Sequence, residues 1–158
     1  MTKKIRGFEV VSKGQLKPLS AHFEEVKIPT RADQGSAGYD FHSCEDCKIE
    51  VGEQHLFWTN IKAYMGQDEV LQIFPRSSMG VKHGLVLANT VGIIDSTYYN
   101  NEGNEGNIGI VLKNMGTEPV VVEVGDRIAQ GIFMKYLVAD IDSTMNSERG
   151  GGFGSSGK

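Results

Sequence analysis

The sequence is poor in the features that mark membrane proteins, secreted proteins and nucleic-acid-binding proteins. It has no apolar run of the ~18 residues from which a membrane-spanning helix is predicted. Its N-terminus, MTKKIRGFEV, lacks the apolar core of a signal peptide. The 16 Lys and Arg residues are outnumbered by 20 Asp and Glu, so the net charge is -4 and bulk electrostatics does not favour nucleic acid. We therefore expect a cytoplasmic protein with no nucleic-acid or membrane partner.

Cysteine and histidine are also scarce. The two cysteines, Cys44 and Cys47, form a single CxxC motif, and the four histidines make no ligand pair. A structural zinc site needs four ligands, and a thioredoxin-like motif needs a βαβ unit that the sequence does not suggest. The favoured interpretation is two reduced thiols in a loop.

Helical periodicity is almost absent, and short strand-like segments take its place. The predicted strands are 8–11, 48–51, 55–61, 70–74, 85–87, 91–94, 107–114, 120–124 and 127–136, with one helical turn at 77–82. Many short strands separated by turn signals favour an all-β sandwich or barrel. A length of 158 residues predicts one domain, and a hydrophobic fraction of 39% is lean enough to suggest help from an oligomeric interface.

Polar stretches between these strands are candidates for chemistry. Arg76, Ser77 and Ser78 follow an apolar strand, where a guanidinium and two hydroxyls could grip phosphate. The alternative is an ordinary turn with a surface arginine. Asp95 ends another apolar strand and could be a general base or a metal-shell ligand, but Asp also initiates turns. Asp126 and Arg127 could simply pair with each other.

The final residues, GGFGSSGK, allow two local interpretations. From Gly152 they nearly match the G-x-x-x-x-G-K pattern of a phosphate-binding loop, but Lys158 is followed by neither Ser or Thr nor a helix. The other interpretation is a disordered tail, which is typical of Gly/Ser-rich termini.

Taken in order, five motifs decide between these interpretations. AGYD, PRSS, G-x-I-D-x-x-Y, GDRIAQ and GGFGSSG closely resemble the trimeric dUTPases (deoxyuridine triphosphate nucleotidohydrolases), and the resemblance runs from about Ile28 to the end. It implies an all-β, distorted jelly-roll (β-clip) subunit in a homotrimer that hydrolyses dUTP to dUMP and pyrophosphate with Mg²⁺. It also implies one domain at 1–140 and a flexible glycine-rich arm at 141–158, closing as a lid over an active site of the trimer.

The resemblance assigns a role to each matching residue. Asp95 would deprotonate the water that attacks the α-phosphorus, and Asp40 would hold a water bound to Mg²⁺. The substrate-binding residues would be Arg76, Ser77 and Ser78 for the phosphates, Asn89, Gly92 and Ile94 for uracil, Tyr98 for deoxyribose, Gln130 in support, and Arg149, Phe153, Gly154, Ser155 and Ser156 from the tail.

Two departures from the family pattern leave alternatives open. The stretch after Tyr98 is longer than in many members, and residues 100–105 are interpreted as an extended hairpin tip, a feature near the metal, or a site for a regulatory protein partner. Arg149 and Phe153 are four apart, one fewer than in many members. A related dCTP deaminase is disfavoured because Lys113 lies near the place of that family's glutamate. A nucleotide-dependent protein-binding module on the same fold is the second alternative.

Overall fold

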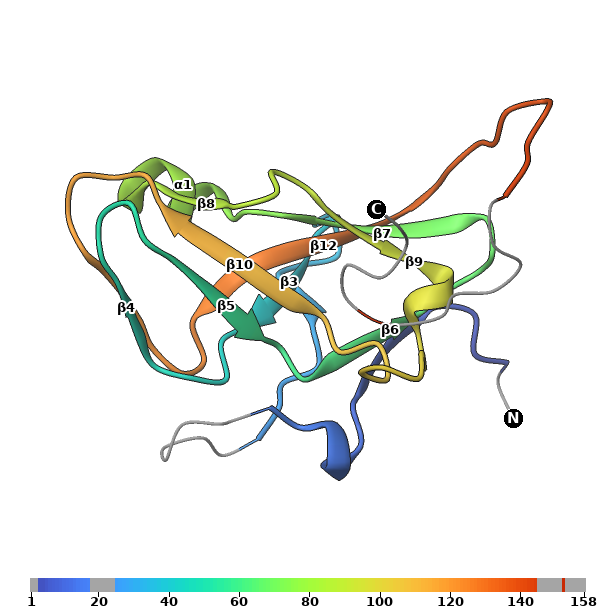
Figure 1. Cartoon of the computed structure of the whole chain (residues 1–158), viewed down its shortest axis with the longest axis horizontal. Helices are drawn as coiled ribbons and strands as arrows, with labels where there is room; N and C mark the ends of the chain where they lie inside the picture. Colours follow the sequence, from blue (N-terminus) through green and yellow to red (C-terminus); the bar gives the residue numbers. More distant parts are fainter. Residues whose placement is uncertain (1–2, 18–24, 145–151, 153–158) are drawn as a thin grey trace.

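Short antiparallel strands make up most of the regular secondary structure of the described residues (Figure 1). The computed structural model describes residues 3–17, 25–144 and 152. The strands are β1 (Gly7–Val10), β2 (Thr30–Arg31), β3 (Tyr39–His42), β4 (Cys47–Ile49), β5 (Gln54–Trp58), β6 (Ile61–Tyr64), β7 (Glu69–Phe74), β8 (Leu85–Leu87), β9 (Gly92–Asp95), β10 (Gly109–Asn114), β11 (Val120–Val122) and β12 (Arg127–Lys135). One α-helix, α1 (Ser77–His83), and two 3-10 turns, Lys13–Gln15 and Ser96–Tyr98, complete the described structure. The all-β prediction is confirmed.

The strands form four sheets around one core. The largest has the order β2-β3-β12-β7-β9, a second has the order β5-β10-β8, and β1-β6 and β11-β4 are pairs. Along β10, buried and half-buried residues alternate, as expected for a strand with one face on the core. The largest completely enclosed side chains come from several sheets and include Phe41, Phe57, Leu71, Leu112 and Ile128.

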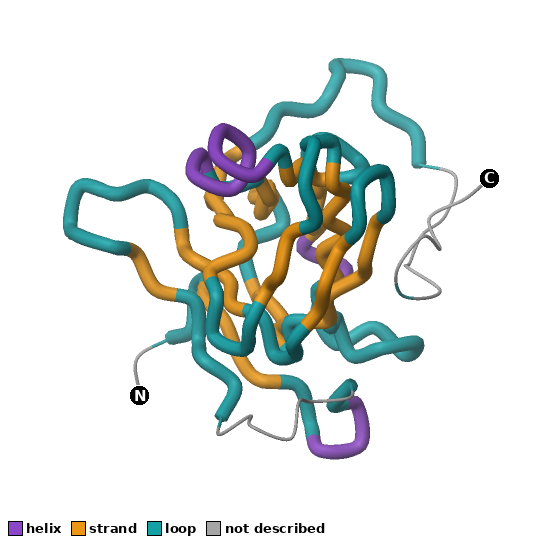
Figure 2. Tube along the Cα trace, turned by 90° about the vertical axis from the view of Figure 1, so that its left-hand side faces the viewer, coloured by secondary structure: helices purple, strands orange, loops and turns teal. Residues whose placement is uncertain are grey.

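The five-stranded sheet brings distant motifs together. On β12, Gln130 lies opposite Asp40 of β3 on one side and opposite Phe74 of β7 on the other. On the far side of β7, Ile73 lies opposite Gly92 of β9. The AGYD, G-x-I-D-x-x-Y and GDRIAQ motifs therefore each contribute residues to strands of one sheet, and PRSS directly follows the end of its strand β7. Figure 2 shows the strands of the molecule in orange and the helices in purple.

Apart from strand limits that shift by one or two residues, the structure differs from the sequence-based strand assignment in two places. The predicted strand 55–61 is two strands, β5 and β6, which pair with different partners. They are separated at Asn60, whose φ of 58° is left-handed and incompatible with a continuous strand. No strand was predicted between residues 11 and 48, but Thr30–Arg31 forms β2 and Tyr39–His42 forms β3.

After β12 the chain leaves the body of the molecule (Figure 1). Leu137 and Ile141 on this segment are almost completely exposed. The assignment of 141–158 as an arm stays a prediction, because most of it falls outside the described residues. Among residues 3–17, 25–144 and 152, no helix is long and apolar enough to cross a membrane.

Candidate active site

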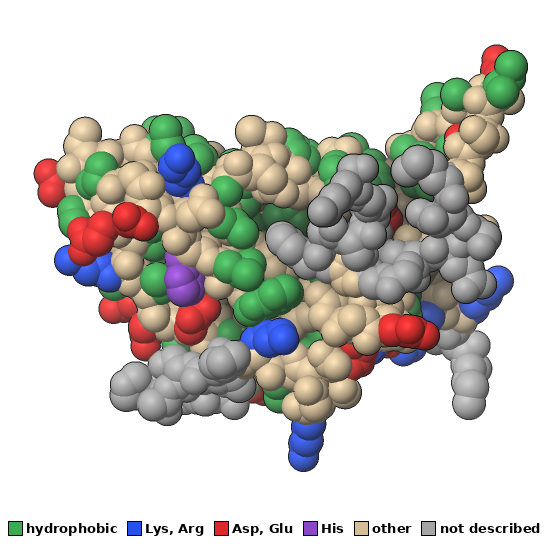
Figure 3. All heavy atoms as spheres, viewed as in Figure 1, with side chains coloured by type: hydrophobic (Ala, Val, Ile, Leu, Met, Phe, Trp, Pro, Cys, Tyr) green, Lys and Arg blue, Asp and Glu red, His purple; other side chains and the backbone are tan. Residues whose placement is uncertain are grey.

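A cavity of about 560 Å³ lies between β8, β9 and β10. Figure 3 shows a recess with hydrophobic side chains in this part of the surface. The cavity is lined by Gln54, Ile73, Leu87, Ala88, Asn89, Gly92, Ile93, Ile94, Asp95, Tyr98, Gly109, Ile110 and Val111. The structure thus brings together the five residues assigned from the sequence to the stretch from Asn89 to Tyr98. It also adds Gln54, which local sequence does not single out, because β5 reaches the cavity only through its pairing with β10.

Close packing of two strands sets one wall of this cavity. A Cβ atom added at Gly92 would lie 2.9 Å from the Cβ of Ile73 on the neighbouring strand. Only glycine allows β9 to approach β7 this closely without displacing Ile73. β9 then delivers Asp95 with its side chain exposed at the edge of the cavity, where water has access to the carboxylate.

Tyr98 is the aromatic residue of the cavity wall, and it is only 4% exposed. Its hydroxyl donates to the backbone oxygen of Asn107 at 2.7 Å. The hydroxyl oxygen of Tyr98 in turn accepts a hydrogen bond from Nδ2 of Asn104 at 2.8 Å. The ring is therefore held from behind by the 99–107 loop, the segment of residues 99–107 that follows it.

A second group of predicted residues gathers around Asp40, which is 8% exposed. Its two carboxylate oxygens pair with Nε of Arg76 at 3.1 Å and with Nη1 of Arg127 at 3.4 Å. Gln130 lies opposite Asp40 in the sheet, and its Nε2 donates to the backbone oxygen of Pro75 at 3.3 Å. Gly38 leaves room for this side chain, because a Cβ there would lie 2.3 Å from Oε1 of Gln130.

The Asp40 group opens onto a hollow of about 420 Å³. Arg76 and Arg127 line it, and Ser77 and Ser78 begin α1 beside Arg76. Burial, followed by the positive charge of Lys27, lowers the pKa of His42, so this nearby imidazole stays neutral near pH 7. The hollow itself is lined by the guanidiniums of Arg76 and Arg127 together with His83 and Asp126.

Asp126 and Arg127 do not pair with each other, a possibility that the sequence left open. Arg127 reaches across the sheet to Asp40, while Oδ2 of Asp126 accepts a hydrogen bond from the backbone N–H of Glu123 at 2.9 Å. That bond closes the turn before β12, in which Gly125 has a φ of 85°. The aspartate shapes the turn, and the strand that follows carries Arg127 to its partner.

The 560 Å³ cavity beside Asp95, called the base cavity below, and the 420 Å³ hollow beside Arg76 and Arg127, called the arginine hollow, are separate hollows. They share no lining residue within the described part of a single chain. The predicted tail residues Arg149, Phe153, Gly154, Ser155 and Ser156 lie outside the described residues. Gly152 is described and packs against the 99–107 loop of its own chain, where a Cβ on Gly103 would lie 3.0 Å from its backbone nitrogen.

The residues described here do not form a protein cage for a metal. Residues 3–17, 25–144 and 152 contain no cluster of three or more His, Cys, Asp or Glu side chains that could hold an ion. Asp40 is a single carboxylate already facing two guanidiniums. Such a site fits Mg²⁺ held mainly by substrate phosphates and water, which is how Mg²⁺ commonly binds in nucleotide enzymes.

The CxxC motif takes no part in either hollow. Cys44 and Cys47 are both free thiols, and Cys44 is buried. Burial raises the pKa of both thiols, which disfavours the reactive thiolate form near neutral pH.

Comparison with known proteins agrees with this arrangement of motifs. A family model described as dUTPase matches residues 24–157. The chain belongs to the dUTPase family. It is 47% identical over 155 residues to the deoxyuridine 5'-triphosphate nucleotidohydrolase of Lactococcus lactis, covering 98% of this chain and 99% of that protein. It is 41% identical over 141 residues to the protein of the same name from Haemophilus influenzae strain PittEE, covering 85% and 89%.

Solved dUTPase structures share the fold. The crystal structure of the Streptococcus mutans dUTPase matches with a TM-score of 0.73 and 42% identity, covering 85% of this chain and 98% of that one. The dUTPase from phage phi11 of S. aureus matches with a TM-score of 0.69, covering 92% and 99%, and at 19% identity it supports the fold alone.

Proposed function

We propose that this chain hydrolyses dUTP to dUMP and pyrophosphate. The observation that carries the proposal is the 560 Å³ cavity with an exposed carboxylate, Asp95, at its edge, in a chain of the dUTPase family. The size lies within the range of small-molecule sites. Relatives such as the Lactococcus lactis protein are named for this reaction.

The wall of the cavity suits a pyrimidine base. Asn89, in the turn after β8, and Gly92 and Ile94, on β9, line its wall, where the backbone can offer fixed donors and acceptors. Uracil presents an N3–H donor beside an O4 acceptor, whereas cytosine reverses this pattern. A buried polar group left unpaired by the wrong base costs enough to discriminate by a factor of ~10⁴.

Asp95 is the proposed general base. Its carboxylate would accept a proton from a water molecule as the water oxygen bonds to the α-phosphorus. The bond from the α-phosphorus to the bridging oxygen then breaks, and pyrophosphate leaves. Arg76, Ser77 and Ser78 would bind the phosphates, with Gln130 supporting Arg76 through Pro75.

The Asp40 group would adapt when a triphosphate arrives. Phosphate oxygens would compete with Asp40 for the guanidinium of Arg76, leaving a carboxylate oxygen for a metal-bound water. Mg²⁺, when bound, would offset the negative charge that develops on the leaving pyrophosphate.

We further propose a homotrimer whose active sites lie between subunits. Two observations support it: the base cavity and the arginine hollow share no lining residue within one described chain, and Val81, Met115 and Val121 are well exposed. Exposed apolar groups are commonly covered by another subunit. The tail would complete the site, with Phe153 stacking on uracil and Arg149, Gly154, Ser155 and Ser156 contacting the γ-phosphate.

The proposal is tested by pyrophosphate release with Mg²⁺ from dUTP, dCTP, dTTP and UTP in parallel. We expect turnover of dUTP alone. Asp95→Asn should lower kcat by ~10²-fold or more, because it removes the proton acceptor but keeps the shape. Binding of dUMP should be unchanged in this variant, which separates loss of the base from loss of the fold. Deamination of dCTP would instead support the deaminase alternative, and nucleotide binding without turnover would support a binding module.

A further inference from the structure

The 99–107 loop folds back beneath Tyr98 instead of projecting as a hairpin tip. Asn101, Asn104 and Asn107 are 9%, 8% and 0% exposed, whereas Glu102 at the apex is exposed. Three buried amides within seven residues need partners, because an unpaired buried polar group is costly. The side chains of Asn101 and Asn104 donate to Tyr98, and the backbone oxygen of Asn107 accepts from it.

Asn104 is the residue of the loop that contacts the tyrosine hydroxyl. Its Nδ2 donates to Oη of Tyr98 at 2.8 Å. Its Oδ1 accepts from Nδ2 of Asn101 at 2.8 Å and from the backbone N–H of Gly106 at 3.1 Å. With its amide held at both ends, Asn104 cannot rotate away without breaking several hydrogen bonds.

The backbone of Tyr98 is held by the same loop. Nδ2 of Asn101 donates to the backbone oxygen of Tyr98 at 2.7 Å, while Oη of Tyr98 donates to the backbone oxygen of Asn107 at 2.7 Å. Asn107 is itself fixed, since Oδ1 accepts from the backbone N–H of Asn60 and Nδ2 donates to Oδ1 of Asn60. Both ends of the tyrosine are therefore attached to one rigid segment.

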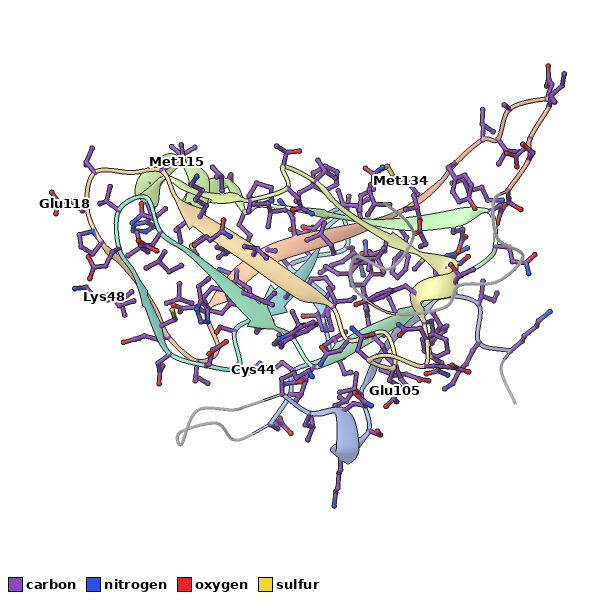
Figure 4. The ribbon with its side chains drawn as sticks, viewed as in Figure 1. Cys44, Lys48, Glu105, Met115, Glu118 and Met134 are labelled. Carbon is purple, nitrogen blue, oxygen red and sulfur yellow. The ribbon has the colours of Figure 1, made fainter. Side chains whose placement is uncertain are left out.

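The loop is anchored to the body of the chain by an ion pair. Oε1 of Glu105 lies 2.5 Å from Nζ of Lys62 on β6, and the Glu105 carboxylate also accepts from the backbone N–H of Ser12. Nζ of Lys62 donates in addition to Oδ1 of Asn100 at 2.7 Å. Figure 4 shows Glu105 beside the N-terminal segment of the chain. These contacts prevent the loop from moving as a free surface loop.

We propose that Asn104 is a positioning residue that sets discrimination between deoxyribose and ribose by fixing the Tyr98 ring. The inference rests on the proposed function, in which Tyr98 packs on the sugar. A ring fixed at its hydroxyl and its backbone presents a hard wall that a 2'-hydroxyl group must displace. Misplacement of such a group by ~1 Å can cost ~10²-fold in rate, so small shifts of this ring matter.

Two substitutions at position 104 separate positioning from folding. Asn104→Ala removes both functions of the amide. Asn104→Asp keeps an oxygen for Asn101 and Gly106 but replaces the N–H donor to Tyr98 by a second oxygen. Glu102→Ala is the matched control, because this residue lies in the same loop and is exposed. Thermal unfolding of each variant shows whether the fold is retained.

We expect the ratio of kcat/KM for UTP over dUTP to rise by ~10-fold in both Asn104 variants, the effect of one neutral hydrogen bond at the upper end of its range. For dUTP, any change in kcat/KM should come mainly from KM and not from kcat, because the variants leave the proposed base, Asp95, unaltered. Tyr98→Phe should raise the ratio similarly. The double variant Tyr98→Phe with Asn104→Ala should be no worse than either single variant, since both remove the same contact.

The preference for deoxyribose is also measured without turnover, as the ratio of Kd for UMP and dUMP, by titrating each nucleotide into each variant calorimetrically. This keeps the test decisive even if wild-type protein does not hydrolyse dUTP, an outcome that would contradict the proposed function alone. An unchanged UMP-to-dUMP ratio of Kd in a folded Asn104 variant would overturn the inference. Additive effects in the double variant would overturn it as well, because they would place the action of Asn104 somewhere other than the Tyr98 hydroxyl.

Discussion

At the scale of single residues, Gly92 shows how the absence of a side chain shapes the candidate site. A Cβ at this position would lie 2.9 Å from the Cβ of Ile73, a contact that real Cβ atoms do not make. Gly92→Ala should therefore force β9 away from β7, lowering the free energy of unfolding by ~1–3 kcal/mol and altering the wall next to Ile94.

Denaturant unfolding measures this loss, and dUMP titration measures its effect on the cavity. Gly14→Ala is the matched control, because a Cβ at Gly14 has no atom within 4 Å and should leave both quantities near wild type. Equal stability of the two variants would mean that β9 is free to move and that Gly92 has no packing role.

At the scale of structural elements, the anchor of the 99–107 loop makes stability depend on pH. The hydrogen bond from Lys62, followed by that from Ser12, lowers the pKa of Glu105 below its ordinary value. A carboxyl whose pKa is depressed by folding stabilises the fold above its unfolded pKa of ~4.3, and this contribution is lost as the pH falls through the lower folded pKa.

Glu105→Gln removes this contribution and tests whether it is lost as the pH falls. The wild type should be more stable than the variant at pH 7, and the difference should shrink as the pH is lowered from about 5 towards 3. Urea unfolding across this range measures it, with Glu102→Gln, an exposed residue of the same loop, as the control. A difference that grows as the pH falls would contradict the assignment of Lys62 as the partner.

At the scale of the whole molecule, the separation of the two hollows predicts shared active sites. Arg76→Ala and Asp95→Asn subunits should each be inactive alone. If each site takes Arg76 from one subunit and Asp95 from another, random mixed trimers should recover roughly a quarter of wild-type activity.

Co-refolding the two variants and measuring pyrophosphate release gives the recovered fraction, and light scattering should give about three times the chain mass of 17.3 kDa. Mixing without refolding is the control, since intact trimers should not exchange during the assay. A trimer that recovers nothing would indicate that each subunit holds a complete site.

The sequence by itself determined the fold class, most strands and the chemical identity of the candidate site. Strand alternation and turn residues are local signals, so β8 matched its predicted limits and α1 nearly did. The break at Asn60 was missed: in the fold its backbone is left-handed and it exchanges hydrogen bonds with Asn107, a residue distant in sequence.

Only the tertiary structure decided which polar groups meet. Arg127 pairs with Asp40, 87 positions away, instead of with adjacent Asp126, because β12 and β3 are neighbours in the sheet. From the sequence, the 99–107 loop was interpreted as an insertion that the fold tolerates, because asparagine and glycine are turn residues. Its buried amides became visible as supports for Tyr98 only when the loop was seen folded beneath it. Hydrogen-bond partners across a sheet or beneath a loop depend on strand order and burial, and neither is encoded in the spacing of neighbouring residues.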